Sequence, residues 1–267
     1  MKIKIGRFDY TECWDGVLYK NLSGYPDLTA WEAQSLLDFI SYEEANGRSC
    51  EIEAEKEILE KLRAYRPVYE SGRRVDPPDR ITECTACPKY KGCLTDMVCH
   101  TSSLEDAIAI LDCGRLLSAV LARKKSAEEL RREPRNAAGD PADYFDYVMF
   151  AWGNCQAGDR LVTERKLGRA PTELELESFT PGVRFYFRYE EIARHPNAVF
   201  DGVLPVKVRD GVALDEWTTV IVAPEEYREA LDPHVPDALR SRIRYFEKGD
   251  LDIWRWSEKV YELARGV

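Results

Sequence analysis

Three closely spaced cysteines are the strongest chemical signal in the sequence. Cys84, Cys87 and Cys93 follow the spacing Cys-x2-Cys-x5-Cys. A gap of two residues lets neighbouring thiolates bind one ion, and a tetrahedral zinc site needs four such ligands. The same residue types would also hold an iron–sulfur cluster. We therefore expect a metal site in a cysteine-rich loop, with zinc as the first choice and an iron–sulfur cluster as the alternative.

The fourth ligand of this site is open from the sequence alone. Cys99 is the nearest candidate, whereas Cys13 and Cys50 would have to come from the N-terminal part of the chain. Four protein ligands would leave no open position for catalysis, so the expected role of the metal is structural.

His100 is the second residue with chemical potential, and it directly follows Cys99 in the apolar segment MVCHT. This segment is expected to be a strand, in which neighbouring side chains point to opposite faces. Cys99 and His100 would then serve different sites. This reasoning favours two separate sites and weakens Cys99 as the fourth metal ligand.

The composition indicates a soluble globular protein. The chain has 267 residues and a formal net charge of −10, with no apolar run of membrane-spanning length and no secretory signal at its start. We expect a cytoplasmic protein with reduced cysteines and no membrane partner. Non-specific nucleic-acid binding requires basic surfaces. The basic run 123–135 could be such a surface, or it could be a solvated helix face.

Capping and helix-ending residues predict two helices in the first part of the chain. Thr29 and Glu32 form a capping box for a helix that Gly47 would end, and a second helix is expected over about 51–65. The first 27 residues look irregular. The polar stretch ESGRRVDPPDR is typical of a linker. These patterns predict a helical N-terminal domain over residues 1–80, followed by the cysteine-rich loop over 81–99.

Strands outnumber helices in the remainder, which predicts an α+β domain over residues 97–267. One helix is expected between Ser103 and Gly114 and another near the C-terminus, in DIWRWSEKVYELA. The segments with strand-like patterns cover residues 147–153, 160–165, 183–189, 203–209 and 218–223.

The stretch CHTSSLEDAIAILDCGRLLSA resembles the opening of the ADP-ribosyltransferase fold. That opening is a strand ending in His-Thr, followed by a helix of the form Ile-Leu-x-x-Gly. DarT-type DNA ADP-ribosyltransferases look nearest, and the resemblance covers about residues 97–230. RNA 2′-phosphotransferases share the same opening. The resemblance implies a split mixed or antiparallel sheet and NAD as a substrate.

The resemblance also implies roles for individual residues. His100 would hydrogen-bond the nicotinamide ribose, the Thr101 backbone would clasp the carboxamide, and Ser102 would belong to the same NAD-binding segment. Arg135 would take the position of the DarT-type arginine, with Arg123 as a competitor. Tyr147 would stack on the nicotinamide.

The catalytic acid has two candidates. Counting back from VAPEEY gives Glu216, whereas an alternative alignment leaves Asp201 as the nearest carboxylate. Cleavage of the nicotinamide–ribose bond builds positive charge on the sugar, which a carboxylate would stabilise. The function that the resemblance implies is NAD-dependent transfer of ADP-ribose to a nucleic acid base or a protein side chain. An RNA 2′-phosphotransferase-like enzyme and a catalytically inactive, metal-stabilised binding protein are the alternatives, because fold alone does not choose among them.

Overall fold

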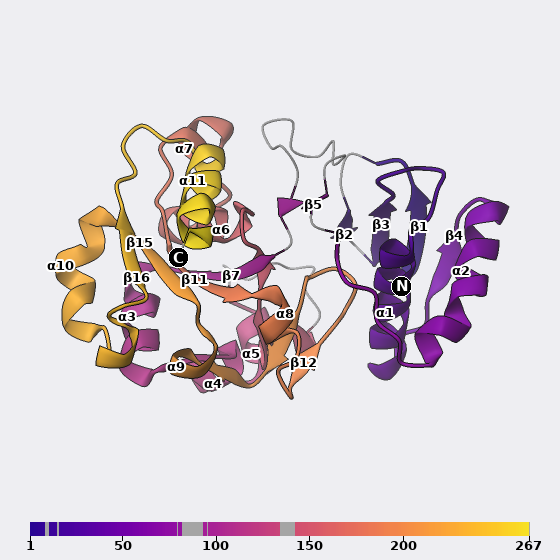
Figure 1. Ribbon diagram of the computed structural model, residues 1–267, viewed down its shortest axis with the longest axis horizontal. Helices are drawn as coiled ribbons and strands as arrows, with labels where there is room; N and C mark the ends of the chain where they lie inside the picture. The colour runs from indigo at the N-terminus through magenta and orange to yellow at the C-terminus, as the bar shows by residue number, and fades with distance from the viewer. Residues whose placement is uncertain are drawn as a thin grey trace. The chain divides into compact units, whose positions relative to one another are not determined.

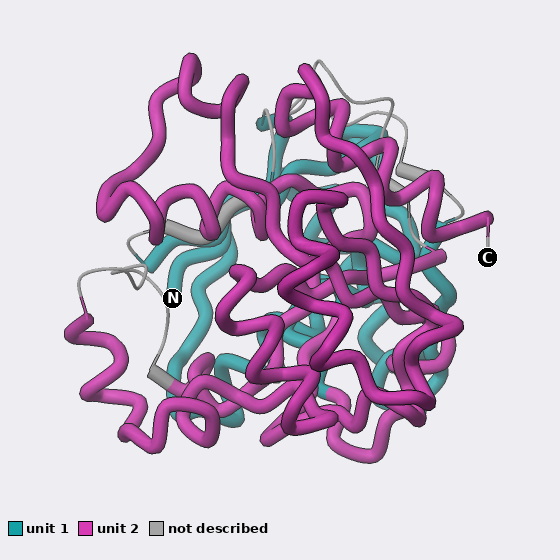
Figure 2. Tube along the Cα trace, turned by 90° about the vertical axis from the view of Figure 1, so that its left-hand side faces the viewer, with its two compact units in different colours: residues 1–95, 199–205 teal, residues 96–198, 206–267 magenta. Residues whose placement is uncertain are grey.

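The computed structural model describes residues 1–8, 11–14, 16–78, 80–81, 93–94, 96–133 and 142–266. The chain divides into two compact units, which are coloured separately in Figure 2. Unit 1 consists of residues 1–95 and 199–205, and unit 2 of residues 96–198 and 206–267. Both units combine helices with strands, so the expected α+β class is correct. No helix in the described ranges has the length and apolar character needed to cross a membrane.

Unit 1 is built on a small sheet with two helices. Its elements are β1 (Lys2–Gly6), β2 (Glu12–Trp14), β3 (Val17–Asn21), α1 (Ala30–Ala45), β4 (Glu51–Glu53), α2 (Lys56–Glu70), β5 (Arg80–Ile81) and β6 (Cys93–Leu94). The first four strands form a sheet of order β2-β3-β1-β4, in which β1 is parallel to β3 and to β4, and β2 is antiparallel to β3. The strands β5 and β6 pair separately.

The prediction of a helical N-terminal domain is therefore wrong. The sequence KIKIG alternates charged and apolar residues, and its Ile3 and Ile5 are buried while Lys2 and Lys4 are partly exposed. This period of two is the pattern of a half-buried strand. The strands of this unit are at most five residues long. Such short alternations are hard to recognise among the aromatic and glycine residues that surround them.

The helix α1 begins as its sequence predicts. The Thr29 hydroxyl accepts a hydrogen bond from the Glu32 amide at 3.2 Å, and the Glu32 carboxylate accepts one from the Thr29 amide at 2.9 Å. Leu36 and Leu37 of this helix lie in the same apolar core as Ile3 and Ile5. Helix α2 begins later and ends later than the expected range of about 51–65, and it contains Pro67.

Two segments behave differently from their sequence-based interpretation. The expected linker is tied to α1, because Arg74 donates to both oxygens of Asp38 at 2.6 and 2.9 Å. Residues 199–205 return from the second half of the chain to join unit 1. There Gly202 adopts a φ of +71°, and its carbonyl accepts a hydrogen bond from the Ser35 hydroxyl at 2.9 Å.

Unit 2 has a mixed central sheet. The strands of the unit are β7 (Met97–Ser102), β8 (Arg115–Leu117), β9 (Tyr147–Met149), β10 (Ala151–Trp152), β11 (Val183–Arg188), β12 (Ala198–Val199), β13 (Lys207–Arg209), β14 (Gly211–Ala213), β15 (Val220–Pro224) and β16 (Ile243–Phe246). The central sheet has the order β10-β7-β11-β15-β16. All its neighbours pair antiparallel except β15 and β16, which are parallel.

The helices of unit 2 cover both faces of this sheet. They are α3 (Leu104–Cys113), α4 (Ala119–Arg123), α5 (Ala127–Arg131), α6 (Ala157–Leu167), α7 (Glu173–Glu177), α8 (Tyr189–Ile192), α9 (Leu214–Trp217), α10 (Arg228–Leu231) and α11 (Ile253–Arg265). In Figure 1, α6 and α11 lie over one face of the sheet and α3 over the other. Two smaller sheets, β12-β13-β9 and β14-β8, complete the unit.

Local signals predicted several of these elements correctly and one incorrectly. The Ser103 hydroxyl caps α3 by accepting from the Asp106 amide at 3.2 Å, and Gly114 ends the helix in the left-handed conformation with a φ of 67°. The segment RLVTER was expected to be a strand, but it forms the middle of α6. This helix ends at Gly168, which also has a positive φ, of 72°. A glycine after such a segment indicates the end of a helix. The prediction instead followed the short apolar alternation, which is typical of a strand.

Candidate functional site

His100 lies near the end of β7, the second strand of the central sheet, where it pairs with Phe185 of β11. Its Nδ1 is 3.1 Å from the carbonyl oxygen of Met149. A carbonyl oxygen only accepts hydrogen bonds, so Nδ1 carries the proton. Burial lowers the pKa of His100, although the Met149 carbonyl opposes that shift. At neutral pH the ring is therefore uncharged, and its Nε2 is a hydrogen-bond acceptor.

Thr101 points to the opposite face of β7 and is held by two glycines. A Cβ added at Gly158 of α6 would lie 2.3 Å from the Thr101 Oγ1. A Cβ added at Gly182 would lie 2.5 Å from its Cγ2. The next residue, Ser102, is buried. The end of β7 is thus fixed by close packing on the face turned away from His100.

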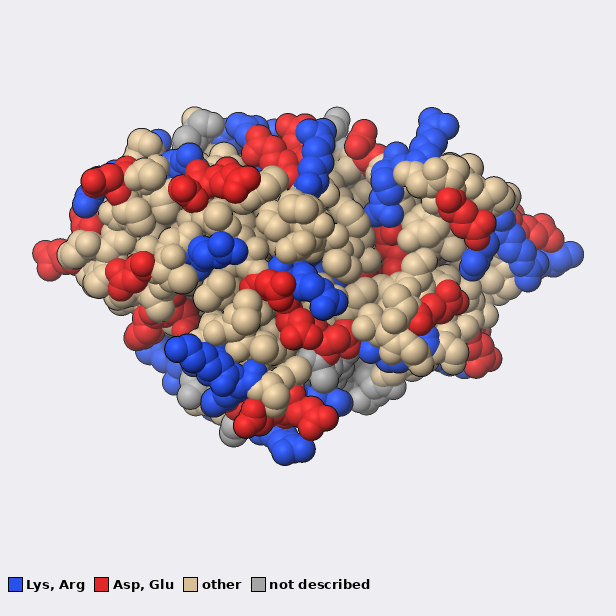
Figure 3. All heavy atoms as spheres, turned by 90° about the horizontal axis from the view of Figure 1, so that it is seen from below, with Lys and Arg blue, Asp and Glu red and all other residues tan. Residues whose placement is uncertain are grey.

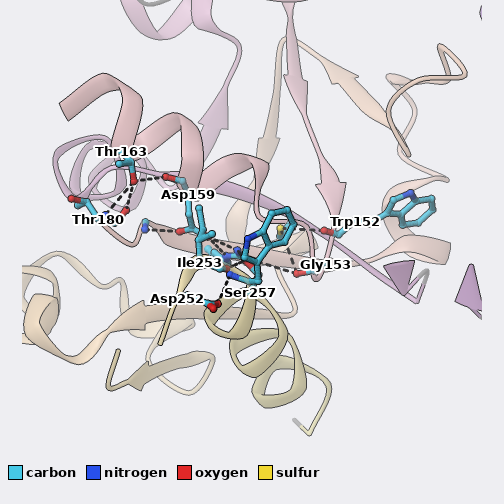
Figure 4. Close-up of polar contacts among 12 residues, drawn as sticks. Trp152, Gly153, Asp159, Thr163, Thr180, Asp252, Ile253 and Ser257 are labelled. Atoms are coloured by element: carbon cyan, nitrogen blue, oxygen red, sulfur yellow. Dashed lines mark hydrogen bonds and ion pairs between the residues drawn. The ribbon is translucent and has the colours of Figure 1, made fainter. Parts of the chain in front are cut away.

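On the same face of the sheet as Thr101, a buried ion pair connects the sheet to α6, and a hydrogen bond connects it to α11 (Figure 4). Arg184 of β11 and Asp159 of α6 are both fully buried and form an ion pair through the Nε and Nη2 atoms of the arginine. Arg184 also donates to the Gly153 carbonyl at 3.1 Å and to the Ser257 hydroxyl at 2.5 Å. Burial is the largest single effect and lowers the pKa of Arg184, but Asp159, Tyr186 and Cys99 together outweigh it and raise that pKa. This network is structural, because its groups satisfy one another.

Asp106 and two arginines form a charged cluster in unit 2. Asp106, in the first turn of α3, forms ion pairs with Arg123 at the end of α4 and with Arg165 of α6. The N–O distances are 3.3 and 3.8 Å. Both Asp106 and Arg165 act on the ionisation of His100, with Arg165 lowering its pKa and Asp106 raising it. The structure thus pairs the predicted Arg123 with a carboxylate whose charge acts on His100, and it adds Arg165, which the sequence reasoning missed.

Arg165 was missed for a specific reason. The segment around it was expected to be a strand, and a strand there did not predict a contact between Arg165 and the helix that carries Asp106. A helix ending at Gly168 would have placed Arg165 in its last turn, so the glycine was the available signal.

Tyr147 is also placed differently from its expected role. The side chain is buried, and Lys207 lies over its ring at 4.5 Å from the centroid. Its hydroxyl accepts a hydrogen bond from Arg209 at 2.8 Å. These cation–π and polar contacts give Tyr147 a structural role within the sheet formed by β9 and β13. Stacking on a nicotinamide would have to compete with the Lys207 contact.

The two candidate acids do not join His100. Glu216 is exposed on α9, where it raises the pKa of His195 against the larger, lowering effect of burial. Among the described residues, no hydrogen bond or ion pair links Glu216 to His100. Asp201 belongs to unit 1, and its Oδ1 accepts from the amides of Val203 and Leu204 at 3.0 and 2.8 Å. This second candidate therefore stabilises a turn.

The predicted metal loop falls largely outside the described residues, as do Cys84, Cys87 and the predicted Arg135. The side chains of Cys93 and Cys13 are likewise not described. Cys99 is buried, with its Sγ 3.8 Å from the Trp152 carbonyl oxygen, and burial raises the pKa of its thiol to about 12. In the described ranges, no group of three or more His, Cys, Asp or Glu residues is placed to hold a metal ion.

The basic run 123–135 is partly neutralised in its described portion. Arg132 pairs with Glu128 at 3.8 Å, and Lys125 pairs with Glu133. The face of the molecule drawn in Figure 3 carries acidic and basic side chains intermixed. These pairs favour a solvated helical face over a continuous surface for nucleic acid.

What the arrangement can do chemically follows from its charges and hydrogen-bonding groups. An uncharged imidazole with a free acceptor nitrogen can hold a hydroxyl group, and two guanidinium groups can hold an anion. A sugar phosphate or a dinucleotide carries both kinds of group. Comparison of the chain with protein-family models, with curated proteins and with solved structures gave no match.

Proposed function

We propose that unit 2 is an NAD-dependent mono-ADP-ribosyltransferase whose acceptor is a nucleic acid base or a protein side chain. The observation that carries the proposal is the state of His100. Its ring is oriented by the Met149 carbonyl, and the lowered pKa keeps Nε2 unprotonated at neutral pH. A ribose hydroxyl can donate a hydrogen bond to such a nitrogen.

The charged groups around Asp106 support the same ligand. Arg123 and Arg165 both reach Asp106, and both are more than a third exposed, with side-chain exposures of 54% and 39%. Guanidinium groups bind phosphate oxygens with two parallel hydrogen bonds. In the proposed complex the ribose contacts His100 and the pyrophosphate contacts these arginines. The carboxamide of the nicotinamide is then clasped by the backbone of Thr101, in the segment that also contains Ser102.

The chemical step needs a carboxylate to stabilise the positive charge that develops on the ribose. Glu216 is the residue we propose for this role, and it would have to approach the bound NAD from α9. The cysteines Cys84, Cys87 and Cys93 are proposed to hold a structural zinc ion, or alternatively an iron–sulfur cluster. Metal analysis of the purified protein and its visible absorption spectrum test that part separately.

The first experiment is a calorimetric titration of the full chain with NAD. Wild type is expected to bind, and His100→Ala is expected to weaken binding about tenfold, which is the typical effect of losing one hydrogen bond. His234→Ala is the matched control, because His234 is a half-exposed histidine of the same unit that pairs with Asp112 at 2.8 Å. Equal affinities of the His100 and His234 variants would contradict the proposal.

The second experiment measures turnover. Labelled NAD is incubated with the protein and with single-stranded DNA, RNA or a protein mixture, and transfer of label is followed in wild type and Glu216→Gln. The proposal requires labelling of one acceptor by wild type and its loss in the variant.

A catalytically inactive NAD-binding protein is the second candidate, and the position of Glu216 favours it. This carboxylate interacts with His195, in a group that also contains Arg115, rather than with His100. NAD binding that depends on His100, together with no release of nicotinamide by wild type, is the result expected of this candidate.

A further inference from the structure

Asp106 occupies an unusual place in unit 2, since one carboxylate is shared by two arginines from different helices. Its Oδ1 is 3.3 Å from Nη2 of Arg123, and its Oδ2 is 3.8 Å from Nη1 of Arg165. Charge-assisted hydrogen bonds between such groups are typically 2.7–2.9 Å long. Both contacts are longer, so neither arginine is held in a close bidentate pair.

The ion pairs at Asp106 are unevenly matched, although the neighbouring Glu105 adds a second, exposed acid to the same turn. Two guanidinium groups face one carboxylate, and the first turn of the ten-residue helix α3 adds the partial positive charge of its N-terminus. Two members of this group act on His100 in opposite directions, since Arg165 lowers its pKa and Asp106 raises it, both less than burial does. An anion with two or more charges would therefore match the two arginines better than the single carboxylate does.

The site is open enough for such an exchange. Side-chain exposures are 54% for Arg123, 39% for Arg165 and 35% for Asp106. Leu161 lies one helical turn before Arg165 on α6 and is 44% exposed. Residues four apart share a helix face, so an apolar side chain lies beside the charged one. A ligand that combines a ring with a phosphate group fits this pair better than inorganic phosphate alone.

We infer that Asp106 is a displaceable counter-ion, which holds Arg123 and Arg165 in the free protein and gives way to the diphosphate group of a bound nucleotide. A monophosphate offers a single phosphate group for the two arginines, whereas a diphosphate can engage each arginine with a separate phosphate and so displace the carboxylate from both. Asp106 thereby selects diphosphates over monophosphates and lowers the affinity for both. It acts as a specificity-determining residue, because its removal improves binding instead of weakening it.

The test compares binding of inorganic pyrophosphate, ADP and AMP to four forms of the full chain. These are wild type, Asp106→Asn, Arg165→Gln and Glu105→Gln. Glu105 is the matched control, because it is an exposed acid in the same turn of α3 and its substitution changes the net charge equally. Thermal unfolding of each variant confirms that it is folded.

Wild type is expected to bind ADP and pyrophosphate more tightly than AMP. Asp106→Asn should tighten all three, AMP the most, by about five- to tenfold, whereas Arg165→Gln should weaken ADP by about tenfold, and Glu105→Gln should change each by less than about twofold. Equal effects of the Asp106 and Glu105 substitutions would indicate general electrostatics and overturn the inference. Weaker binding by Asp106→Asn, or no binding of ADP and pyrophosphate to wild type at millimolar concentration, would also overturn it.

The inference rests on the proposed function only in taking a nucleotide as the ligand. Pyrophosphate and ADP contain no nicotinamide–ribose bond, so their binding does not depend on ADP-ribosyl transfer. Binding of ADP with the expected variant pattern, but without turnover of NAD, would leave Asp106 as a counter-ion and contradict the transferase alone.

Discussion

The buried pair of Arg184 and Asp159 gives the sharpest test of how unit 2 is held together. In Arg184→Met, the apolar chain keeps most of its volume, but the carboxylate of Asp159 loses its cationic partner and retains the Gly182 amide, which donates to it at 2.7 Å. The Gly153 carbonyl and the Ser257 hydroxyl also lose a donor. Removing one member of a buried ion pair typically destabilises a protein by about 3–5 kcal/mol. For a unit of this size, the midpoint of thermal unfolding should fall by about 10 °C.

Calorimetry or circular dichroism on two further variants decides whether the ion pair is responsible. Arg184→Met combined with Asp159→Asn removes both charges, so the double variant should be more stable than the sum of the two single effects predicts, by about 1–3 kcal/mol. Arg169→Met removes a pair with Glu175 at the surface, where both partners are solvent-accessible, and should leave the midpoint close to that of wild type. Strict additivity in the double variant, or equal effects of the Arg184 and Arg169 substitutions, would refute the reasoning.

Three further predictions concern packing and protonation. Gly158→Ala improves helix propensity but places a Cβ 2.3 Å from the Thr101 Oγ1, so urea unfolding should show a net loss of about 2 kcal/mol. Gly202→Ala combines a φ of +71° with a Cβ 2.0 Å from the Ser35 carbonyl oxygen, and it should destabilise unit 1 by at least about 2 kcal/mol in the same assay. Because the pKa of His100 is lowered in the folded state, the unfolded chain takes up that proton first, and stability should fall as pH drops below about 6.5. A His100→Gln variant should show a smaller fall, as measured by thermal unfolding between pH 7.5 and 5.

Elements with signals at both ends were predictable from the sequence. Helix α3 begins at a serine cap and ends at a left-handed glycine, and both signals act within a few residues of chain. The strand β7 was also predicted, since it is a short apolar run directly before that cap. Because these two elements are adjacent in sequence, the placement of His100 at a strand end followed from local information.

Elements whose identity depends on distant contacts were not predictable in the same way. The strand β1 buries Ile3 and Ile5 against a core that includes Leu36 and Leu37, more than thirty residues further along. Residues 199–205 belong to unit 1 through contacts such as that of Gly202 with Ser35. The sequence of neither segment indicates which distant residues it contacts. The predicted boundary at residue 80 therefore differs from the observed units, in which residues 1–95 and 199–205 belong together.

The residues of the candidate site also differ in whether local sequence could predict them. His100 and Arg123 were named from the sequence, and Arg123 reaches Asp106 in the structure through the chain between α3 and α4. Arg165 arrives from α6, whose helical character had to be recognised first. Glu216 was placed by counting from a motif, and counting gives position along a strand but not the direction in which a following short helix presents its side chain.

The two faces of β7 have different tolerances, and this difference bears on how a ligand would be bound. On one face Thr101 is packed between Gly158 and Gly182, and its strand partner Arg184 anchors the buried ion pair. Close-packed regions of this kind resist displacement. On the other face His100 is only partly buried and is oriented by a single carbonyl group. The adjustments that accompany binding should therefore occur in the side chains of Asp106 and the arginines, while the strand that carries the imidazole stays in place.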